Sequence, residues 1–154
     1  NIMGKFLFLL ALFLVTLLSY RSFAEENWKF IKDAEYCFIQ SIPSKTEIPE
    51  GKARGKHGVL VYKIHKSSEI IVQITAGFEY RSEDSISVKI GKSNYDFYTD
   101  SDTAWASEDK KVIYAMKKGL ELIITSISSK GTKVIDTYSL KGFTSGINKI
   151  SNDC

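Results

Sequence analysis

Apolar and polar residues alternate along several short segments of the chain, which is the pattern of half-buried strands. In residues 85–90, three apolar residues, Ile86, Val88 and Ile90, alternate with polar ones and therefore share one face of a strand. Turn-forming residues at 91–94 separate this strand from a second stretch that contains two aromatic residues. The pattern predicts a β-hairpin.

The same alternation, interrupted by short polar turns, predicts six further strands. They cover residues 28–31, 36–42, 59–64, 70–76, 120–127 and 133–140. Many short strands joined by turns are typical of antiparallel sandwiches and barrels. We therefore expect residues 25–154 to form one all-β domain, a single antiparallel β-sandwich or barrel-like fold of about eight strands.

The composition of residues 25–154 also favours strands. They include 31 valine, isoleucine and threonine residues against 11 leucine, methionine and alanine residues. A branched Cβ restricts the side chain and suits a pleated, half-buried surface.

Two segments have a helical rather than an alternating pattern. Ser107 as an N-cap, acidic residues in the first turn, basic residues in the last and Gly119 at the exit predict one short helix over about 108–118. The C-terminal segment predicts a short helical tail that buries Ile147 and Ile150.

The N-terminal segment has the layout of a secretory signal peptide. Lys5 precedes the apolar run 6–18, and the small residues Ser22 and Ala24 follow it. The run is too short to cross a bilayer as a helix. We expect residues 1–24 to be removed, which leaves no stable membrane span; the open alternative is an uncleaved anchor.

Charge becomes nearly balanced once this segment is excluded. The whole chain has a formal net charge of +3, but the residues after position 24 include 19 basic and 18 acidic side chains. A nucleic-acid binder normally has a marked basic excess on one face. We therefore expect no nucleic-acid partner.

Export changes the interpretation of the two cysteines, Cys37 and Cys154. In an oxidising compartment a disulfide between them is favoured over a redox pair, and two cysteines are too few for a tetrahedral metal site unless both histidines join them. The open alternative is a free or intermolecular Cys154, because it is the last residue.

The two histidines, His57 and His65, lie outside any recognisable nucleophile or metal-ligand pattern. We interpret both as solvated polar side chains. The glycine-containing segment 51–57 lacks the spacing of a phosphate-binding loop. The sequence therefore predicts no catalytic residue, no cofactor site and no metal site.

The segment 43–57 is the longest predicted loop, and it is basic. We interpret its cations as aids to solubility, partly offset by neighbouring glutamates. The cations are Lys45, Lys52, Arg54 and Lys56. A contact with an anionic lipid or glycan is the open alternative.

Acidic and aromatic residues are combined in residues 95–105. Asp100 and Asp102 do not begin a calcium loop, because Ala104 occupies the fifth position and Lys111 the twelfth. Trp105 and the neighbouring tyrosines are candidates for an exposed binding platform, although aromatic residues on strands usually fill the core.

Several short strings in the mature chain resemble the invasion-associated locus B family of exported alphaproteobacterial proteins. The most recognisable is the string Ser139, Leu140, Lys141, Gly142 and Phe143. The early Trp28 and the Cys-x-x-Gln pattern that begins at Cys37 resemble the opening of that family. Many members have additional cysteines, which this chain lacks near positions 32–33 and 100–105.

The resemblance implies a β domain in the periplasm or at the envelope, linked in pathogenic relatives to host-cell entry, and implies no established catalytic residues. We expect Leu140 and Phe143 to anchor a corner in the core, with Gly142 supplying a backbone angle that a side chain would resist.

The leading functional hypothesis is a non-enzymatic envelope protein that binds another protein or a cell-surface component. The alternative is a periplasmic carrier of a small apolar or aromatic ligand. A hydrolase that uses His57 or His65 is the third hypothesis.

Overall fold

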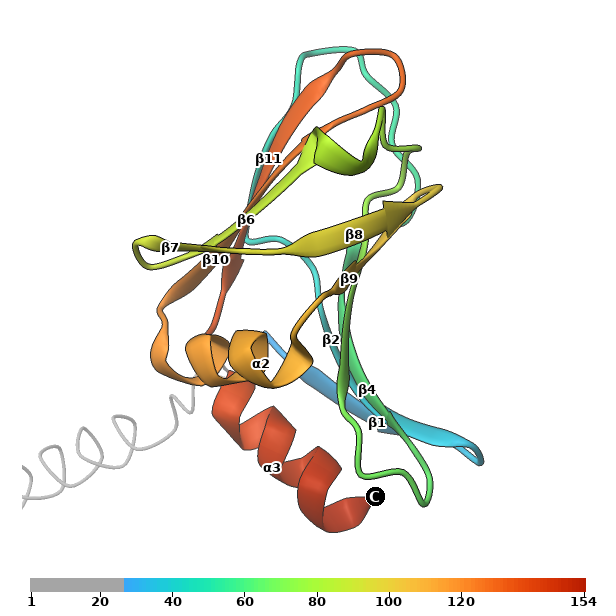
Figure 1. Ribbon diagram of the computed structural model, residues 1–154, viewed down its shortest axis with the longest axis vertical. Coiled ribbons are helices and arrows are strands. Elements are labelled where there is room, and N and C mark those ends of the chain that lie inside the picture. The colour runs from blue at the N-terminus through green and yellow to red at the C-terminus, as the bar shows by residue number, and fades with distance from the viewer. Residues whose placement is uncertain (1–26) are drawn as a thin grey trace, which may run out of the picture.

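The computed structural model describes residues 27–154, and the predicted signal peptide lies outside them (Figure 1). These residues form two antiparallel sheets and two α-helices. The strands are β1 (Lys29–Lys32), β2 (Tyr36–Ser41), β3 (Lys45–Glu47), β4 (Gly58–Ile64), β5 (Ile71–Thr75), β6 (Ile86–Ile90), β7 (Ser93–Tyr95), β8 (Phe97–Asp100), β9 (Thr103–Ala106), β10 (Glu121–Ile127) and β11 (Lys133–Ser139). The helices are η1, a 3-10 turn (Glu83–Ser85), α2 (Asp109–Lys118) and α3 (Phe143–Asp153).

The two sheets confirm the sandwich-like prediction, and they do not close into a barrel. The six-stranded sheet has the order β1-β2-β4-β5-β9-β8, and the five-stranded sheet has the order β3-β11-β10-β6-β7. The predicted hairpins β4–β5, β6–β7 and β10–β11 all pair antiparallel. The chain passes from one sheet to the other after β2, β3, β5, β7 and β9. Helices α2 and α3 lie together at one end (Figure 1).

Two strands, β3 and β9, were not predicted from the sequence. β3 lies inside the segment predicted to be a loop, and its three residues are exposed and pair with β11 at the edge of the sheet. β9 lies in the acidic and aromatic segment and pairs with β5. The single strand predicted through Tyr95 and Phe97 is split into β7 and β8, which belong to different sheets. The helices also differ in detail: α2 has Glu108 rather than Ser107 at its N-cap, and α3 is longer than the predicted tail.

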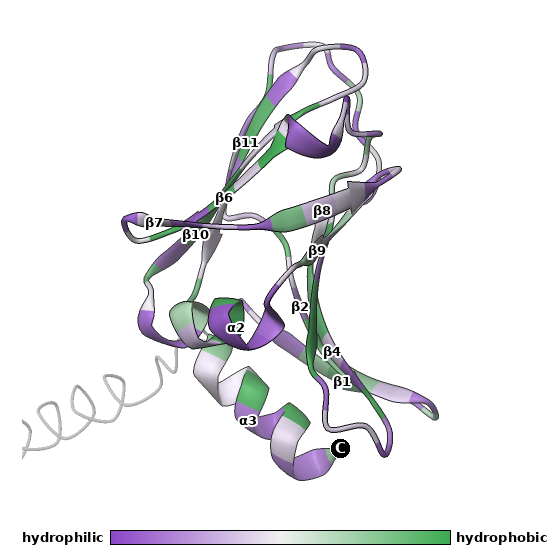
Figure 2. Cartoon of the chain, viewed as in Figure 1, coloured by the Kyte–Doolittle hydropathy of each residue, from purple (hydrophilic) through white to green (hydrophobic). Residues whose placement is uncertain are grey.

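Apolar residues of both sheets and both helices meet in one core. Val88 and Ile90 on β6, Met116 on α2 and the predicted Ile147 and Ile150 on α3 are all buried. Figure 2 shows apolar residues mixed with hydrophilic ones along the strands and on α3, as expected for elements with one buried side.

The corner between β11 and α3 explains the motif that begins at Ser139. Trp28 donates its indole N–H to the Ser139 carbonyl oxygen at 2.9 Å, and its ring meets the Phe143 ring edge-on with centroids 5.0 Å apart. Leu140 and Phe143 are buried, whereas Gly142 adopts a φ of 86°, a left-handed conformation that favours glycine. The motif therefore has the structural role expected from the sequence.

A buried ion pair joins the loop after β3 to both sheets. Arg54 donates two hydrogen bonds to the carboxylate of Asp136 on β11, at 2.9 and 2.6 Å, and the two side chains are only 7% and 4% exposed. The Arg54 Nε donates to the carbonyl of Ala76, just after β5, at 2.6 Å, and Thr46 donates its hydroxyl to Asp136 at 2.8 Å. The expectation that Arg54 is a solvated charge is therefore wrong.

Two buried tyrosines, Tyr80 and Tyr138, lie near this ion pair. Burial raises the pKa of Tyr80 to about 12 and also raises the pKa of Tyr138. The Asp136 charge adds to both rises and Arg54 opposes them. The Ser126 side chain opposes part of the rise at Tyr80, although the Tyr80 hydroxyl has no hydrogen-bond partner among the described residues.

The disulfide between Cys37 and Cys154 ties the end of the chain to β2. The two Cα atoms are 6.0 Å apart, and the bond spans 117 residues of sequence. Beside it, the Lys32 ammonium group donates a hydrogen bond to the Asp153 carbonyl oxygen at 2.7 Å. The bond confirms the favoured prediction and fixes the C-terminal end of α3 against the six-stranded sheet.

We expect Asp136→Asn to lower the free energy of unfolding by about 3 to 5 kcal/mol, because it leaves the Arg54 charge buried and unpaired. Urea unfolding at neutral pH measures the loss. Lys111→Gln, which breaks an exposed ion pair with Glu108, is the control and should cost less than about 1 kcal/mol. Arg54→Met combined with Asp136→Leu should recover most of the loss, and an equal loss in this double variant would contradict the electrostatic explanation.

We expect alkaline pH to destabilise the fold partly through Tyr80. Its folded-state pKa is raised above the unfolded value. The stability that protonated Tyr80 contributes is therefore fully present below about pH 10 and is lost as the pH rises to about 12. Between pH 8 and pH 11 the wild type should lose about 1 kcal/mol more stability than Tyr80→Phe. Parallel urea titrations at the two pH values measure this difference, and equal losses would refute it.

We expect Cys37→Ser combined with Cys154→Ser to lower the free energy of unfolding by about 4 to 5 kcal/mol, because the unfolded chain gains the entropy of a very long loop. Chemical unfolding of the two proteins with and without reductant tests this. Reductant should shift the wild type toward the variant and leave the variant unchanged; a wild type insensitive to reductant after unfolding would rule out the bond.

Candidate binding surface

The outer face of the six-stranded sheet presents large apolar and aromatic side chains as well as polar ones. On β4, Val59 and Val61 point into the core, while the alternating residues Leu60 and Tyr62 lie on the opposite face and are only half-buried. Both helices lie on the side that faces the five-stranded sheet, since Gly146 of α3 packs on the buried Ile39 (Figure 1). No described element covers the outer face.

Five aromatic side chains lie on this outer face, and we refer to them as the aromatic row. They are Tyr36, Phe38, Tyr62, Trp105 and Tyr98. The Tyr36 ring centroid is 5.5 Å from that of Phe38 and 6.5 Å from that of Tyr62. Tyr98 stacks on Trp105 with centroids 5.7 Å apart and an angle of 24° between the rings.

The two halves of the aromatic row are adjacent to one another. Burial raises the pKa of Tyr62, the charges of Asp109 and Tyr98 add to the rise, and the Trp105 side chain opposes part of it. They agree with the strand pairing, which places Tyr62 on β4 and Trp105 on β9 on the same face, with only β5 between them. The row is accessible, because Tyr36 is 36% exposed and Tyr98 is 55% exposed.

An open groove of about 950 Å³ lies at one end of this face. Its lining includes Lys29 of β1, Gln40 of β2, Leu60 of β4, and Lys56 and His57 of the loop before β4. No aspartate or glutamate is among the lining residues. We call this hollow the cationic groove.

The loop that supplies Lys56 and His57 is held by backbone and side-chain bonds. Arg54 is fixed by Asp136, and the Gly55 N–H donates to the Gly77 carbonyl oxygen at 2.9 Å. The His57 Nδ1 lies 2.9 Å from the Gly55 carbonyl oxygen, which can only accept, so Nδ1 carries the hydrogen. Lys56 is exposed, as the sequence predicted.

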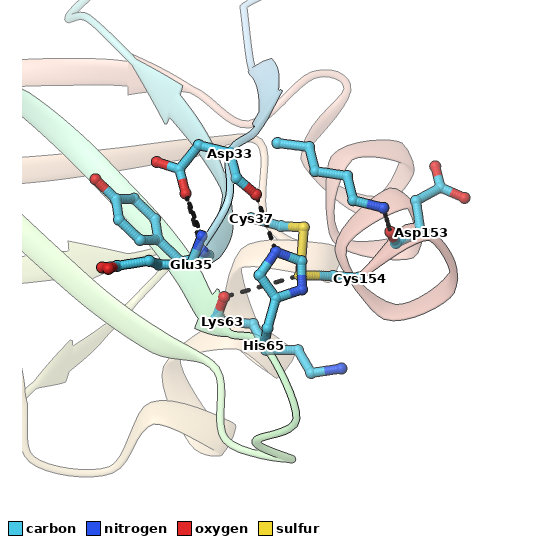
Figure 3. Close-up of a disulfide and its surroundings, with 9 residues drawn as sticks. Asp33, Glu35, Cys37, Lys63, His65, Asp153 and Cys154 are labelled. Carbon is cyan, nitrogen blue, oxygen red and sulfur yellow. Dashed lines mark hydrogen bonds between the residues drawn. A yellow bond between two sulfur atoms is a disulfide. The ribbon is translucent and has the colours of Figure 1, made fainter.

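The histidines are not paired with a nucleophile. Among residues 27–154, neither His57 nor His65 forms a hydrogen bond with a serine or threonine hydroxyl. The His65 Nε2 lies 3.0 Å from the Asp33 carbonyl oxygen, and its Nδ1 lies 3.7 Å from the Cys154 sulfur (Figure 3). The side chains give no catalytic pair of the kind that a hydrolase requires.

Cys37, His65 and Cys154 form the one group of metal-ligating side chains that comes together within the described residues, with ligand atoms within 4.8 Å of one another. His57 is not part of the group. Thiolates are the zinc ligands that cysteines provide, and these two sulfur atoms are bonded to each other instead. The group is therefore a structural disulfide bond with a histidine beside it.

Asp33 fixes the conformation of the turn beside this disulfide bond. Its carboxylate accepts hydrogen bonds from the backbone N–H groups of Tyr36 and Glu35, at 3.0 and 2.9 Å (Figure 3). These two bonds hold the pKa of Asp33 below its usual range, and His65 makes a smaller contribution in the same direction. The role of Asp33 is to fix the turn between β1 and β2.

Sequence reasoning identified Trp105 as a platform candidate but missed most of the surface. The residues missed are Lys29, Tyr36, Phe38, Gln40, Leu60, Tyr62 and Gln73. The signal was present, because residues 36–39 and 59–62 are apolar or aromatic at nearly every position rather than at alternate ones. Such strands have two apolar faces, and a two-layer sandwich covers only one.

The described residues contain no helix that is long and apolar enough to cross a membrane. The chain was also compared with known proteins. A family model described as "Invasion associated locus B (IalB) protein" matches residues 31–151. The comparison with curated proteins gave no match.

One solved structure is similar to this chain in fold, the "Crystal structure of invasion associated protein b from bartonella henselae". The sequence identity is 14%, the TM-score is 0.60, and the match covers 82% of this chain and 92% of that chain. At this identity the likeness shows the fold alone. Because the family model spans most of the sequence, from β1 to α3, the chain belongs to the invasion-associated locus B family.

Proposed function

We propose that this protein is exported and acts in the periplasm or at the envelope as a non-enzymatic binding protein. The aromatic row is the surface that contacts its partner, a protein or a component of the cell surface. The observation that carries the proposal is a sheet face, uncovered by any described element, with five aromatic side chains that form two groups of contacting rings. Large exposed apolar patches are uncommon on monomers and mark interaction sites.

The chemistry of the row suits binding. Tyrosine and tryptophan combine a large apolar area with a polar tip, and they dominate the energetics of protein interfaces. The row lies on strands whose backbones are paired on both sides within the sheet, apart from the edge strand β8. A rigid platform of this kind loses little conformational entropy when a partner binds.

Two features support export. The apolar run 6–18 behind Lys5 has the form of a signal peptide, and a disulfide such as that between Cys37 and Cys154 persists in oxidising compartments.

The geometry gives less support to the other candidate functions. A carrier of a small apolar ligand requires a concave site that encloses most of the ligand, whereas the cationic groove is an open surface feature. The hydrolase hypothesis lacks a hydroxyl or thiol paired with His57 or His65 among the described residues.

We expect Tyr36→Ala combined with Tyr98→Ala to weaken binding to an envelope partner at least tenfold, because truncating central aromatic residues of an interface typically costs more than about 1 to 2 kcal/mol. The immobilised mature chain, residues 25–154, is incubated with solubilised envelope material, and bound components are quantified by mass spectrometry. The affinity of each recovered component is then measured for every variant.

Tyr114→Ala is the matched control, because Tyr114 is a tyrosine of similar exposure, 61%, on helix α2. It should bind as the wild type does. All three proteins should have the same urea midpoint within experimental error. Recovery of the same components in the same amounts by every variant would contradict the proposal.

A further inference from the structure

A second set of side chains, which we call the cross-strand row to distinguish it from the aromatic row, spans all six strands of the outer face. Its members occupy matching positions in successive strand pairs. In order from β1 to β8, they are Lys29, Gln40, Leu60, Gln73, Trp105 and Tyr98. With strands about 4.8 Å apart, the row is about 24 Å long. It has a cation at one edge of the sheet and stacked aromatic rings at the other.

The cationic groove lies at the Lys29 end of this row. Lys29, Gln40 and Leu60 belong to both the row and the groove. The groove is therefore continuous with the aromatic part of the same face, and a single extended ligand can contact both.

Within residues 27–154, no acidic side chain neutralises the positive charge of the groove. Lys29 and Lys56 are exposed and form no ion pair with another described residue. The Arg54 charge, in contrast, is cancelled by Asp136 in a bidentate pair. The positive charge of the groove therefore favours a ligand that carries an anionic group.

Beyond the groove, the cross-strand row can contact a ligand through aromatic rings and side-chain amides but not through backbone groups. The backbones of β2, β4, β5 and β9 are hydrogen-bonded to strands on both sides, so an extended peptide cannot add to this face as a further strand. A sugar ring has an apolar C–H face that stacks on aromatic rings, and hydroxyls that bond amides such as those of Gln40 and Gln73. A ring that also carries a carboxylate or phosphate matches the lysines.

We propose that the outer face of the six-stranded sheet binds an acidic polysaccharide, with the anionic groups at Lys29 and Lys56 and sugar rings against Trp105 and Tyr98. The proposal rests on the proposed function, because it names the class of envelope component that the aromatic row contacts. An acidic peptide is the competing occupant that the experiment must exclude.

The test uses three probes with the disulfide-bonded mature chain: a galacturonate hexamer, its neutral methyl ester, and a hexaglutamate peptide. Calorimetry should show that the hexamer binds more tightly than either of the others, with an affinity that falls as salt is added. Lys29→Gln combined with Lys56→Gln should weaken binding of the hexamer about tenfold, the effect of losing two exposed charge contacts.

The control removes Lys89 of β6 and Lys92 of the turn between β6 and β7, by Lys89→Gln combined with Lys92→Gln, and should leave the affinity unchanged. In NMR spectra the hexamer should shift the indole N–H signal of Trp105. The signal of Trp28, whose N–H is bound to the Ser139 carbonyl inside the corner, should not move.

Three results would overturn the inference. They are no binding of the hexamer, equal binding of hexaglutamate with the same Trp105 shift, and an affinity that is insensitive to the loss of Lys29 and Lys56. If envelope components are still captured in a manner that depends on Tyr36 and Tyr98, the proposed function stands and only the acidic sugar is excluded. Failure of that capture as well removes both.

Discussion

The buried pair of Arg54 and Asp136 is the interaction on which the arrangement of the two sheets and the groove depends. Arg54 reaches Asp136 in the five-stranded sheet with two hydrogen bonds and the Ala76 carbonyl beside the six-stranded sheet with a third. Desolvating two charges is costly, so the pair adds little net stability, but leaving either partner alone would cost far more. The pair therefore selects one position of the loop, and that position places Lys56 and His57 in the groove.

Much of the fold could be predicted from the sequence because period-two alternation in a two-layer protein reports the buried face directly. Ile86, Val88 and Ile90 are an example, since their neighbours are polar and their strand has solvent on its other side. β3 has no such signal: all three of its residues are exposed, and it is a strand only because its backbone pairs with β11. Arg54 was misinterpreted for a related reason, because its partner Asp136 lies 82 residues away in the sequence.

The binding surface was harder to predict than the fold because a single strand does not reveal which strands become its neighbours. Trp105 and Tyr98 come from one hairpin, and Tyr62 and Phe38 come from strands far from them in the sequence. The aromatic row exists only after β9 pairs with β5 and brings the two groups onto one face. What the sequence did contain was an excess of apolar residues in β2 and β4 beyond the number that one core can bury.

An uncovered apolar face exposes a sheet protein to aggregation, and the same features that limit this risk also define what can bind. Edge strands are where sheets add further strands, and here β1 has a lysine at each end and β8 has only four residues and ends at Asp100. Pairing of these edges with strands of another molecule is therefore disfavoured, whereas the outer face between the two edges stays open. A ligand must then be recognised by side chains alone, and those present are rings, amides and ammonium groups that form no ion pair within residues 27–154. This combination selects against a purely apolar partner, because a lysine-flanked surface gains most when the ligand supplies both an apolar ring face and negative charge.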